Sequence, residues 1–211
     1  MTLIRKKINW VTMTRPEFLG VERIIVFASG TSVNSIPQGT LDTIFNKDKT
    51  NLTITLNYGI AKFNSDFNFI TDKEPLRWAR LLNKWQQSRI VAHFSNAEKW
   101  TPYYFRTQEL NGFKSSFTLV NTLLCIRSNK ALRDKPIYIY GLDMYTKPEG
   151  VKYYDDVVMG VCDNNASRKT PQKFFDLCER DLSEMIYDKS NIFNCNFASS
   201  CGLFEFKMPY E

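Results

Sequence analysis

The stretch RIIVFASGTSVNSIP, residues 23–37, joins an apolar, β-branched run to a turn of small residues and then to a segment that a proline begins. The run 23–28 has the length and composition of a buried strand. Gly30 stands among hydroxyl residues ahead of a helical segment, where free backbone N–H groups can hold an anion such as phosphate. The same residues also suit an ordinary strand-to-helix turn. The stretch therefore predicts a strand, a turn and a helix, and leaves open whether the turn binds a phosphate.

Strands and helices alternate along the rest of the chain. Further strands are predicted over residues 52–56, 66–71, 88–94, 135–145 and 191–195, and helices over 75–87, over 115–129 and from 170 onward. Residues 146–169 are long for a loop and are predicted to form a lid-like segment. Strands separated by helices predict a single α/β domain over residues 1–211, Rossmann-like, with a mostly parallel sheet flanked by helices.

Composition narrows the class of protein. Hydrophobic residues make up 43% of the chain and no apolar run approaches bilayer length, so we expect a soluble cytoplasmic protein. Five cysteines without a C-x-x-C pair predict neither a disulfide framework nor a zinc site. The one histidine, His93, lies in the apolar run RIVAHF and is expected in the core. The net charge of +6 favours an anionic partner such as a nucleotide, a nucleic acid or an acidic glycan.

Small, polar and acidic residues follow the predicted strands. In open α/β sheets, ligands bind at the carboxyl ends of the strands, so these residues are the candidate binding site. Two serines that follow Lys114 at the start of a long predicted helix join them, because a helix N-terminus beside a cation suits a phosphate. The candidate binding residues are Gly30, Thr31, Ser32, Asn57, Asp72, Ser115, Ser116, Gly141 and Asp143.

The order of four motifs resembles a known group of enzymes. The chain carries VFASGTS, TLNYG, KSSFTLVNTLLC and IYIYGLDMY in the order and spacing of the bacterial lipooligosaccharide sialyltransferases. The wider group of similar proteins also includes the archaeal MptE-like hydroxymethylpterin diphosphokinases. The resemblance covers roughly residues 23–156. It implies a Rossmann-like, GT-A-like glycosyltransferase that uses a nucleotide-sugar as its donor substrate and needs no other cofactor and no metal.

The resemblance also implies where catalysis takes place. In the sialyltransferases two tyrosines hydrogen-bond the departing phosphate, which corresponds here to Tyr145 with Tyr153 or Tyr154. Those enzymes carry a catalytic histidine in the following segment, and this chain has none there. A carboxylate must then deprotonate the acceptor hydroxyl. The candidates are Asp155, Asp156 and Asp163, with Asp72 and Asp143 as rivals.

The acceptor and the reaction class stay open. A hydroxylated base in DNA or RNA, as in bacteriophage-type base glycosylation, would use stacking rings and phosphate-binding cations, and a glycan would use the same rings. These side chains are Trp78, Trp85, Trp100, Tyr103 and Tyr104, with Arg106, Lys114, Arg168 and Lys169. One alternative is pyrophosphoryl transfer to a pterin, with Mg²⁺ on Asp72 or Asp143. Another is a non-catalytic nucleotide- or nucleic-acid-binding module.

Overall fold

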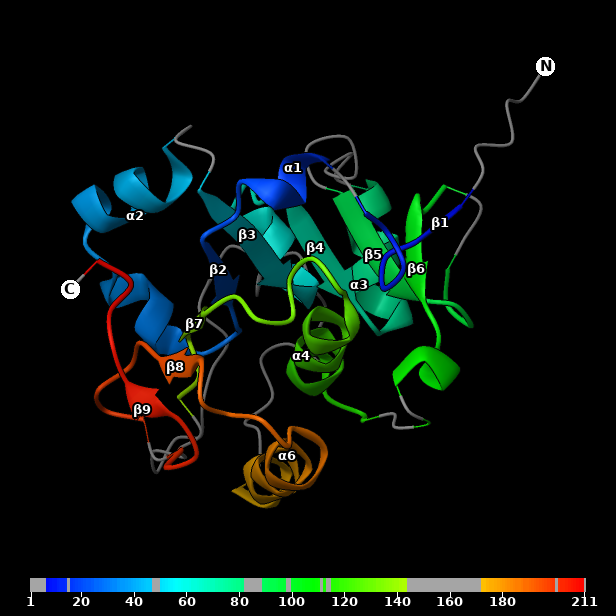
Figure 1. Ribbon diagram of the computed structural model, residues 1–211. Coiled ribbons are helices and arrows are strands. Elements are labelled where there is room, and N and C mark those ends of the chain that lie inside the picture. The colour runs from blue at the N-terminus through cyan, green and yellow to red at the C-terminus, as the bar shows by residue number, and fades with distance from the viewer. Residues whose placement is uncertain are drawn as a thin grey trace.

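One parallel sheet organises the molecule. The computed structural model describes residues 7–14, 16–46, 50–81, 89–97, 100–110, 112, 115–143, 172–199 and 201–210. The nine strands among these residues form a single sheet in the order β1-β6-β5-β4-β3-β2-β7-β8-β9, with every neighbouring pair parallel. Helices flank this sheet (Figure 1). The predicted Rossmann-like α/β fold with a parallel sheet is confirmed.

The elements have the following bounds. The strands are β1 (Ile8–Asn9), β2 (Arg23–Phe27), β3 (Asn51–Leu56), β4 (Phe67–Ile70), β5 (Arg89–His93), β6 (Tyr103–Phe105), β7 (Ile137–Tyr140), β8 (Ile192–Asn194) and β9 (Glu205–Phe206). The helices are α1 (Pro16–Leu19), α2 (Gln38–Phe45), α3 (Lys73–Leu81), α4 (Thr118–Ser128) and α6 (Gln172–Met185), with 3-10 turns η1 (Thr31–Ser35), η2 (Asn57–Ala61) and η4 (Thr107–Leu110).

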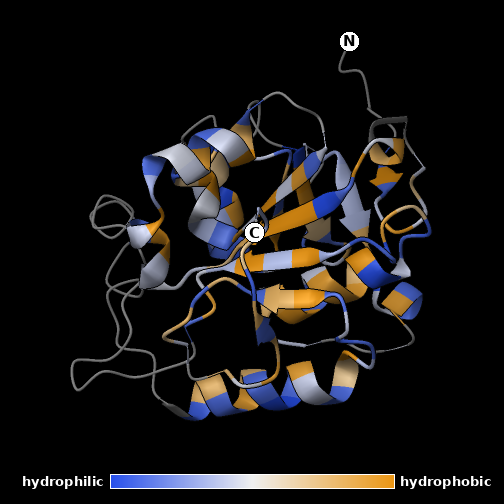
Figure 2. Ribbon diagram, turned by 60° about the vertical axis from the view of Figure 1, so that its left-hand side comes forward, coloured by the Kyte–Doolittle hydropathy of each residue, from blue (hydrophilic) through white to orange (hydrophobic). Residues whose placement is uncertain are grey.

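Both faces of the sheet are covered, which explains the apolar runs in the sequence. Successive side chains of a strand point to opposite faces. In β2, Ile24 and Val26 therefore join the core beneath α4 and the N-terminal segment, whereas Ile25 and Phe27 join a second core with α2 and η1. A third cluster packs α3 and η2 on β4 and β5. Apolar residues accordingly dominate the central strands (Figure 2), as expected for strands buried on both sides.

The order in which strands are added to the sheet reverses at β2. From β2 the chain adds β3, β4, β5 and β6 on one side, and α4 then returns it to β7 on the other side. Ligands of doubly wound sheets bind in the crevice at this switch point, outside the carboxyl ends of the two strands. The fold therefore predicts a ligand-binding site at the residues that follow β2 and β7.

Three short strands at or next to the edges of the sheet were not predicted from the sequence. β1, β6 and β9 are two or three residues long, and β6 contains two tyrosines that were interpreted as stacking residues. The predicted helix over 75–87 is observed as Lys73–Leu81, and residues 82–88 and the predicted lid lie outside the described residues. Within the described ranges, no helix is both long and apolar enough to cross a bilayer.

Candidate functional site

The turn after β2 closes on a buried carboxylate that follows β7. Asp143 is only 2% exposed, and one of its oxygens accepts hydrogen bonds from the Ser32 backbone N–H (3.0 Å) and the Thr31 hydroxyl (3.3 Å). The other oxygen accepts from the Ser32 hydroxyl and from the Asn196 amide, which lies 2.8 Å away. The N–H of Ser32 is thus already bonded to an anion that belongs to the chain itself.

Two glycines make this close approach possible. A Cβ on Gly30 would lie 2.4 Å from the Gly141 carbonyl oxygen and 2.5 Å from Cγ of Asp143. Gly141 has φ of +78°, and a Cβ there would lie 2.7 Å from Val33. Gly30 was predicted from the sequence to be a binding residue. In the structure, its missing side chain makes room for the turn after β7.

A hollow of about 340 Å³ opens beside this turn. It is lined by η1 and by the segments after β8 and β9, including Thr31, Ser35, Cys195 and Asn196. Asn196 was missed by the sequence analysis, although it follows a predicted strand and the same rule for strand ends applies to it. Ser199 was missed as well, and its hydroxyl donates to the carbonyls of Leu142 and Asp143 (3.1 Å for Asp143).

Asn57 forms a second part of the same sheet edge, after β3. Its φ of +46° makes it the one non-glycine residue with positive φ in the described part of the chain. Its amide nitrogen donates to the Thr118 hydroxyl at the start of α4 (2.9 Å) and to Asp72 (3.3 Å). Its amide oxygen is buried and has no hydrogen-bond partner among the described residues. A donor on a ligand would satisfy this acceptor.

Asp72 has a perturbed ionisation. Burial raises the pKa of its carboxyl from the ordinary 3.8, the hydrogen bond from Asn57 opposes the shift, and Glu74 adds to it. A charged ligand bound at this edge of the sheet would therefore change the pKa of Asp72 further.

Asp143 is a poor candidate for the Mg²⁺ ligand that pyrophosphoryl transfer would need, because both of its oxygens accept hydrogen bonds from the protein. Among the described residues no group of three or more His, Cys, Asp or Glu could hold a metal ion.

The two predicted serines before α4 differ in their surroundings. Ser115 is 3% exposed, and its hydroxyl donates to Asp181 of α6 at 2.6 Å. It therefore fastens α6 to the start of α4. Ser116 is exposed. Of the pair, Ser116 alone has a side chain that a ligand can reach, next to the first turn of α4.

Most of the aromatic residues expected to stack on an acceptor are not available. Trp78 and Tyr103 are buried at 6% and 5% exposure, and Trp100 packs against the α3 core. Tyr104 is half-buried and Arg106 is exposed, both at β6. Trp85, Lys114, Arg168 and Lys169 lie outside the described residues, as do the predicted catalytic residues Tyr145, Tyr153, Tyr154, Asp155 and Asp156 and also Asp163.

His93 was expected in the core, but it is only half-buried, and both of its ring nitrogens have hydrogen-bond partners. Its ring nitrogens lie 2.7 Å from the Ser95 hydroxyl and 3.0 Å from the Thr107 hydroxyl. It ends β5 and faces a separate hollow at the carboxyl edge of the sheet.

Comparisons of the chain with protein-family models, curated proteins and solved structures returned no match. The fold and the site thus define the class on their own. The chain is a Rossmann-like α/β protein whose polar residues gather at the topological switch point and at the neighbouring strand end.

Proposed function

We propose that this chain is a glycosyltransferase that binds a nucleotide-sugar across the ends of β2, β3 and β7 and transfers the sugar to a hydroxyl acceptor. The observation that carries the proposal is the turn Gly30–Ser32, closed on Asp143 beside a hollow of about 340 Å³ at the switch point. Nucleotides bind at this place in doubly wound sheets. The motif order described above supplies the reaction class.

The charges suggest how the donor lies. Asp143 is a buried carboxylate next to the hollow, so an uncharged nucleoside fits there better than a phosphate. Thr31, Ser35 and Asn196 offer it hydroxyls and an amide. The donor phosphate would then lie toward the first turn of α4, where a helix N-terminus favours negative charge. Asn57, joined to α4 by its hydrogen bond to Thr118, lies on this route. Its amide oxygen, which has no partner among the described residues, would accept a hydrogen bond from an N–H or O–H of the nucleotide-sugar.

In the proposed reaction the acceptor oxygen attacks the anomeric carbon of the sugar. A bond forms between that oxygen and the carbon, the bond from the carbon to the phosphate oxygen breaks, and the nucleotide leaves with the electron pair. A carboxylate takes the acceptor proton. Tyr145 with Tyr153 or Tyr154 as donors to the leaving phosphate remain predictions of the resemblance. Asp155, Asp156 or Asp163 as the base remains a prediction from the sequence, made because the histidine of the sialyltransferases is missing there.

Thermal unfolding in the presence of CMP-, UDP-, GDP- and ADP-sugars tests the proposal. A ligand at 100 times its Kd should stabilise the fold by about 2.7 kcal/mol. Asn57→Gly removes the amide while keeping a residue that accepts positive φ, and should abolish the shift without unfolding the protein. Asn191→Gly makes the same chemical change at the amino ends of the strands, where the Asn191 carbonyl accepts a hydrogen bond from the N–H of Ile137 at the start of β7. It should leave the thermal shift intact.

Two outcomes would contradict the proposal. The first is a lack of stabilisation by every nucleotide-sugar, which would favour a module without this chemistry. The second is transfer that stops when EDTA is added, because pyrophosphoryl transfer to a pterin requires Mg²⁺ and the proposed reaction does not.

A further inference from the structure

A second hollow, of about 490 Å³, lies at the carboxyl ends of β5 and β6. The turn after β5 and the turn η4 form its walls, and neither takes part in the site at β2 and β7. Strands lie about 4.8 Å apart, so β5 is about 14 Å from β2 along the same edge. The Asn96 amide donates to the carbonyl of Thr71, which ties the turn after β5 to the end of β4. The hollow therefore lies on the same edge of the sheet as the proposed donor site, two strands beyond β3.

An aromatic surface and a cation form one wall of this hollow. Phe94 is 48% exposed, and its ring lies 5.4 Å from that of Tyr104 at an angle of 62°. The Arg106 guanidinium lies 4.4 Å from the centre of the Phe94 ring and 5.4 Å from that of Tyr104. The cation–π contacts hold the guanidinium in place without neutralising its charge.

The Arg106 guanidinium is available to form an ion pair with an anionic ligand. Glu109 is the carboxylate nearest to it in the sequence, but the Glu109 oxygens accept from the Arg106 backbone N–H (2.9 Å) and from the Asn9 amide. Over the ranges that the structure describes, no carboxylate lies within ion-pair distance of the Arg106 guanidinium. An arginine that is held in position and exposed matches the geometry of a carboxylate or a phosphate.

We infer that this hollow binds the acceptor of the transfer, and that the acceptor is a saccharide with a carboxylate or phosphate group. The role of the bound saccharide as acceptor rests on the proposed function, whereas the binding of an acidic saccharide in this hollow does not. The C–H face of a sugar ring packs on Phe94, Arg106 pairs with the acidic group, and the exposed amide of Gln108 lies within the same wall. The volume falls within the range of sites for small ligands.

A nucleic acid strand fits the same surface less well. Strands are held by a positively charged groove that follows several phosphates, with bases stacked on successive rings. This hollow offers one guanidinium and one well exposed ring, which is fewer cations and rings than a strand of several nucleotides needs. The observations therefore favour the acidic saccharide.

His93 provides the readout, because it is the one histidine in the sequence and lines the hollow. In protein labelled with ¹³C and ¹⁵N at histidine, the imidazole signals are followed during titration with four probes. These are methyl glucuronide, glucose 6-phosphate, methyl glucoside and a ten-nucleotide thymidylate strand. The two acidic sugars should give saturable shifts with a Kd about tenfold below that of methyl glucoside, equivalent to one charge-assisted contact.

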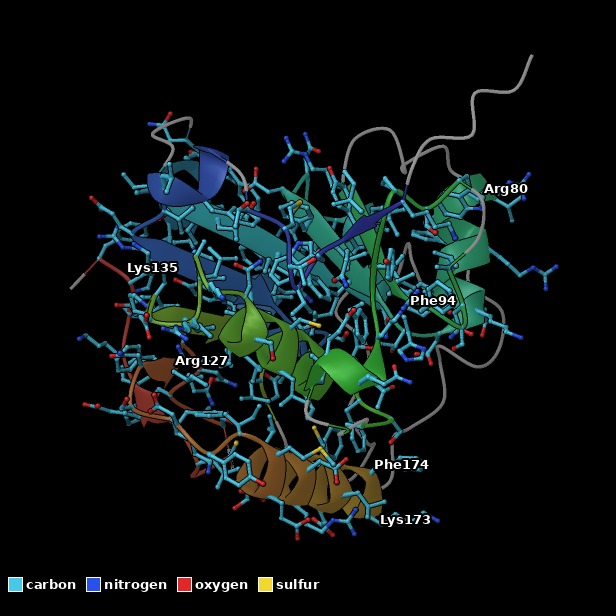
Figure 3. All side chains as sticks on the ribbon, turned by 45° about the vertical axis from the view of Figure 1, so that its right-hand side comes forward. Arg80, Phe94, Arg127, Lys135, Lys173 and Phe174 are labelled. Atoms are coloured by element: carbon cyan, nitrogen blue, oxygen red, sulfur yellow. The ribbon has the colours of Figure 1, made fainter. Side chains whose placement is uncertain are left out.

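Variants assign the contacts. Arg106→Gln should remove the preference for the acidic sugars, and Phe94→Ala should weaken all three sugars by about tenfold or more. Arg80→Gln and Phe174→Ala are matched controls, because both side chains are exposed and they lie on α3 and α6, away from Phe94 (Figure 3). These controls should leave every Kd unchanged.

Three results would overturn the inference. They are the absence of shifts with both acidic sugars, equal affinity for acidic and neutral sugars, and tighter binding of the thymidylate strand with dependence on Arg106. Since no nucleotide-sugar is present in the titration, its outcome does not depend on donor binding. Saccharide binding without any stabilisation by nucleotide-sugars would disprove the transferase and leave this site in place.

Discussion

Gly30→Ala tests whether the turn after β2 depends on contact with β7. Gly30 has φ of −73° and ψ of 153°, which alanine adopts without strain, so the effect of the substitution is steric. The new Cβ would lie 2.4 Å from the Gly141 carbonyl oxygen and 2.6 Å from a carboxylate oxygen of Asp143. Contacts this short force the two turns apart.

The size of the effect follows from what must move. Crowding a well packed site costs about 1–3 kcal/mol. Losing one hydrogen bond to the Asp143 carboxylate, such as that from the Ser32 N–H at 3.0 Å, adds about 1.5–3 kcal/mol. The reduced freedom of the unfolded chain returns about 0.5 kcal/mol. The net loss of unfolding free energy should be about 3 kcal/mol, a large part of the total for an ordinary domain.

Urea denaturation followed by circular dichroism measures this loss through the midpoint at constant m-value. Gly39→Ala is the matched control, because a Cβ at this position in α2 meets nothing within 4 Å. It should raise the stability by about 0.5–1 kcal/mol. A Gly30→Ala protein within about 0.5 kcal/mol of the parent would refute the assigned role of Gly30.

Two further predictions concern ionisation and thiol reactivity. Because burial raises the pKa of Asp72 above 3.8, its charged form disfavours the fold at neutral pH and its protonated form does not. Asp72→Asn should therefore gain stability relative to the parent as the pH rises from below 3.8 to 7, as urea midpoints across this range will show; a constant difference would contradict it. Cys195 is half-buried and lines the hollow at β2, whereas burial raises the pKa of Cys178 to about 12. Iodoacetamide at pH 8 should modify Cys195 faster, and a bound nucleotide-sugar should slow that reaction, as peptide mass spectrometry can measure; equal rates at the two thiols would contradict this.

Local patterns in the sequence predicted the central strands and the main helices well. Runs such as RIIVF and NLTITL in β2 and β3 are long, apolar and β-branched, and a strand buried on both faces needs little more. The short strands β1, β6 and β9, at or next to the edges of the sheet, carry no comparable signal. They are strands because a neighbour in the sheet supplies their hydrogen bonds, and tertiary context then overrides local preference.

Local sequence patterns were enough to predict the alternation of strands and helices, and with it that the polar residues after the strands meet at one edge. What those residues contact at that edge depends on how the distant parts of the chain pack together. The tertiary structure showed that Gly30 makes room for Asp143 and that Ser115 binds Asp181, while the amide oxygen of Asn57 has no partner among the described residues. These partners are separated by tens of residues or more in the chain, and no local pattern encodes which side chain fills the space beside another. That choice is made when the sheet assembles and its two sides pack.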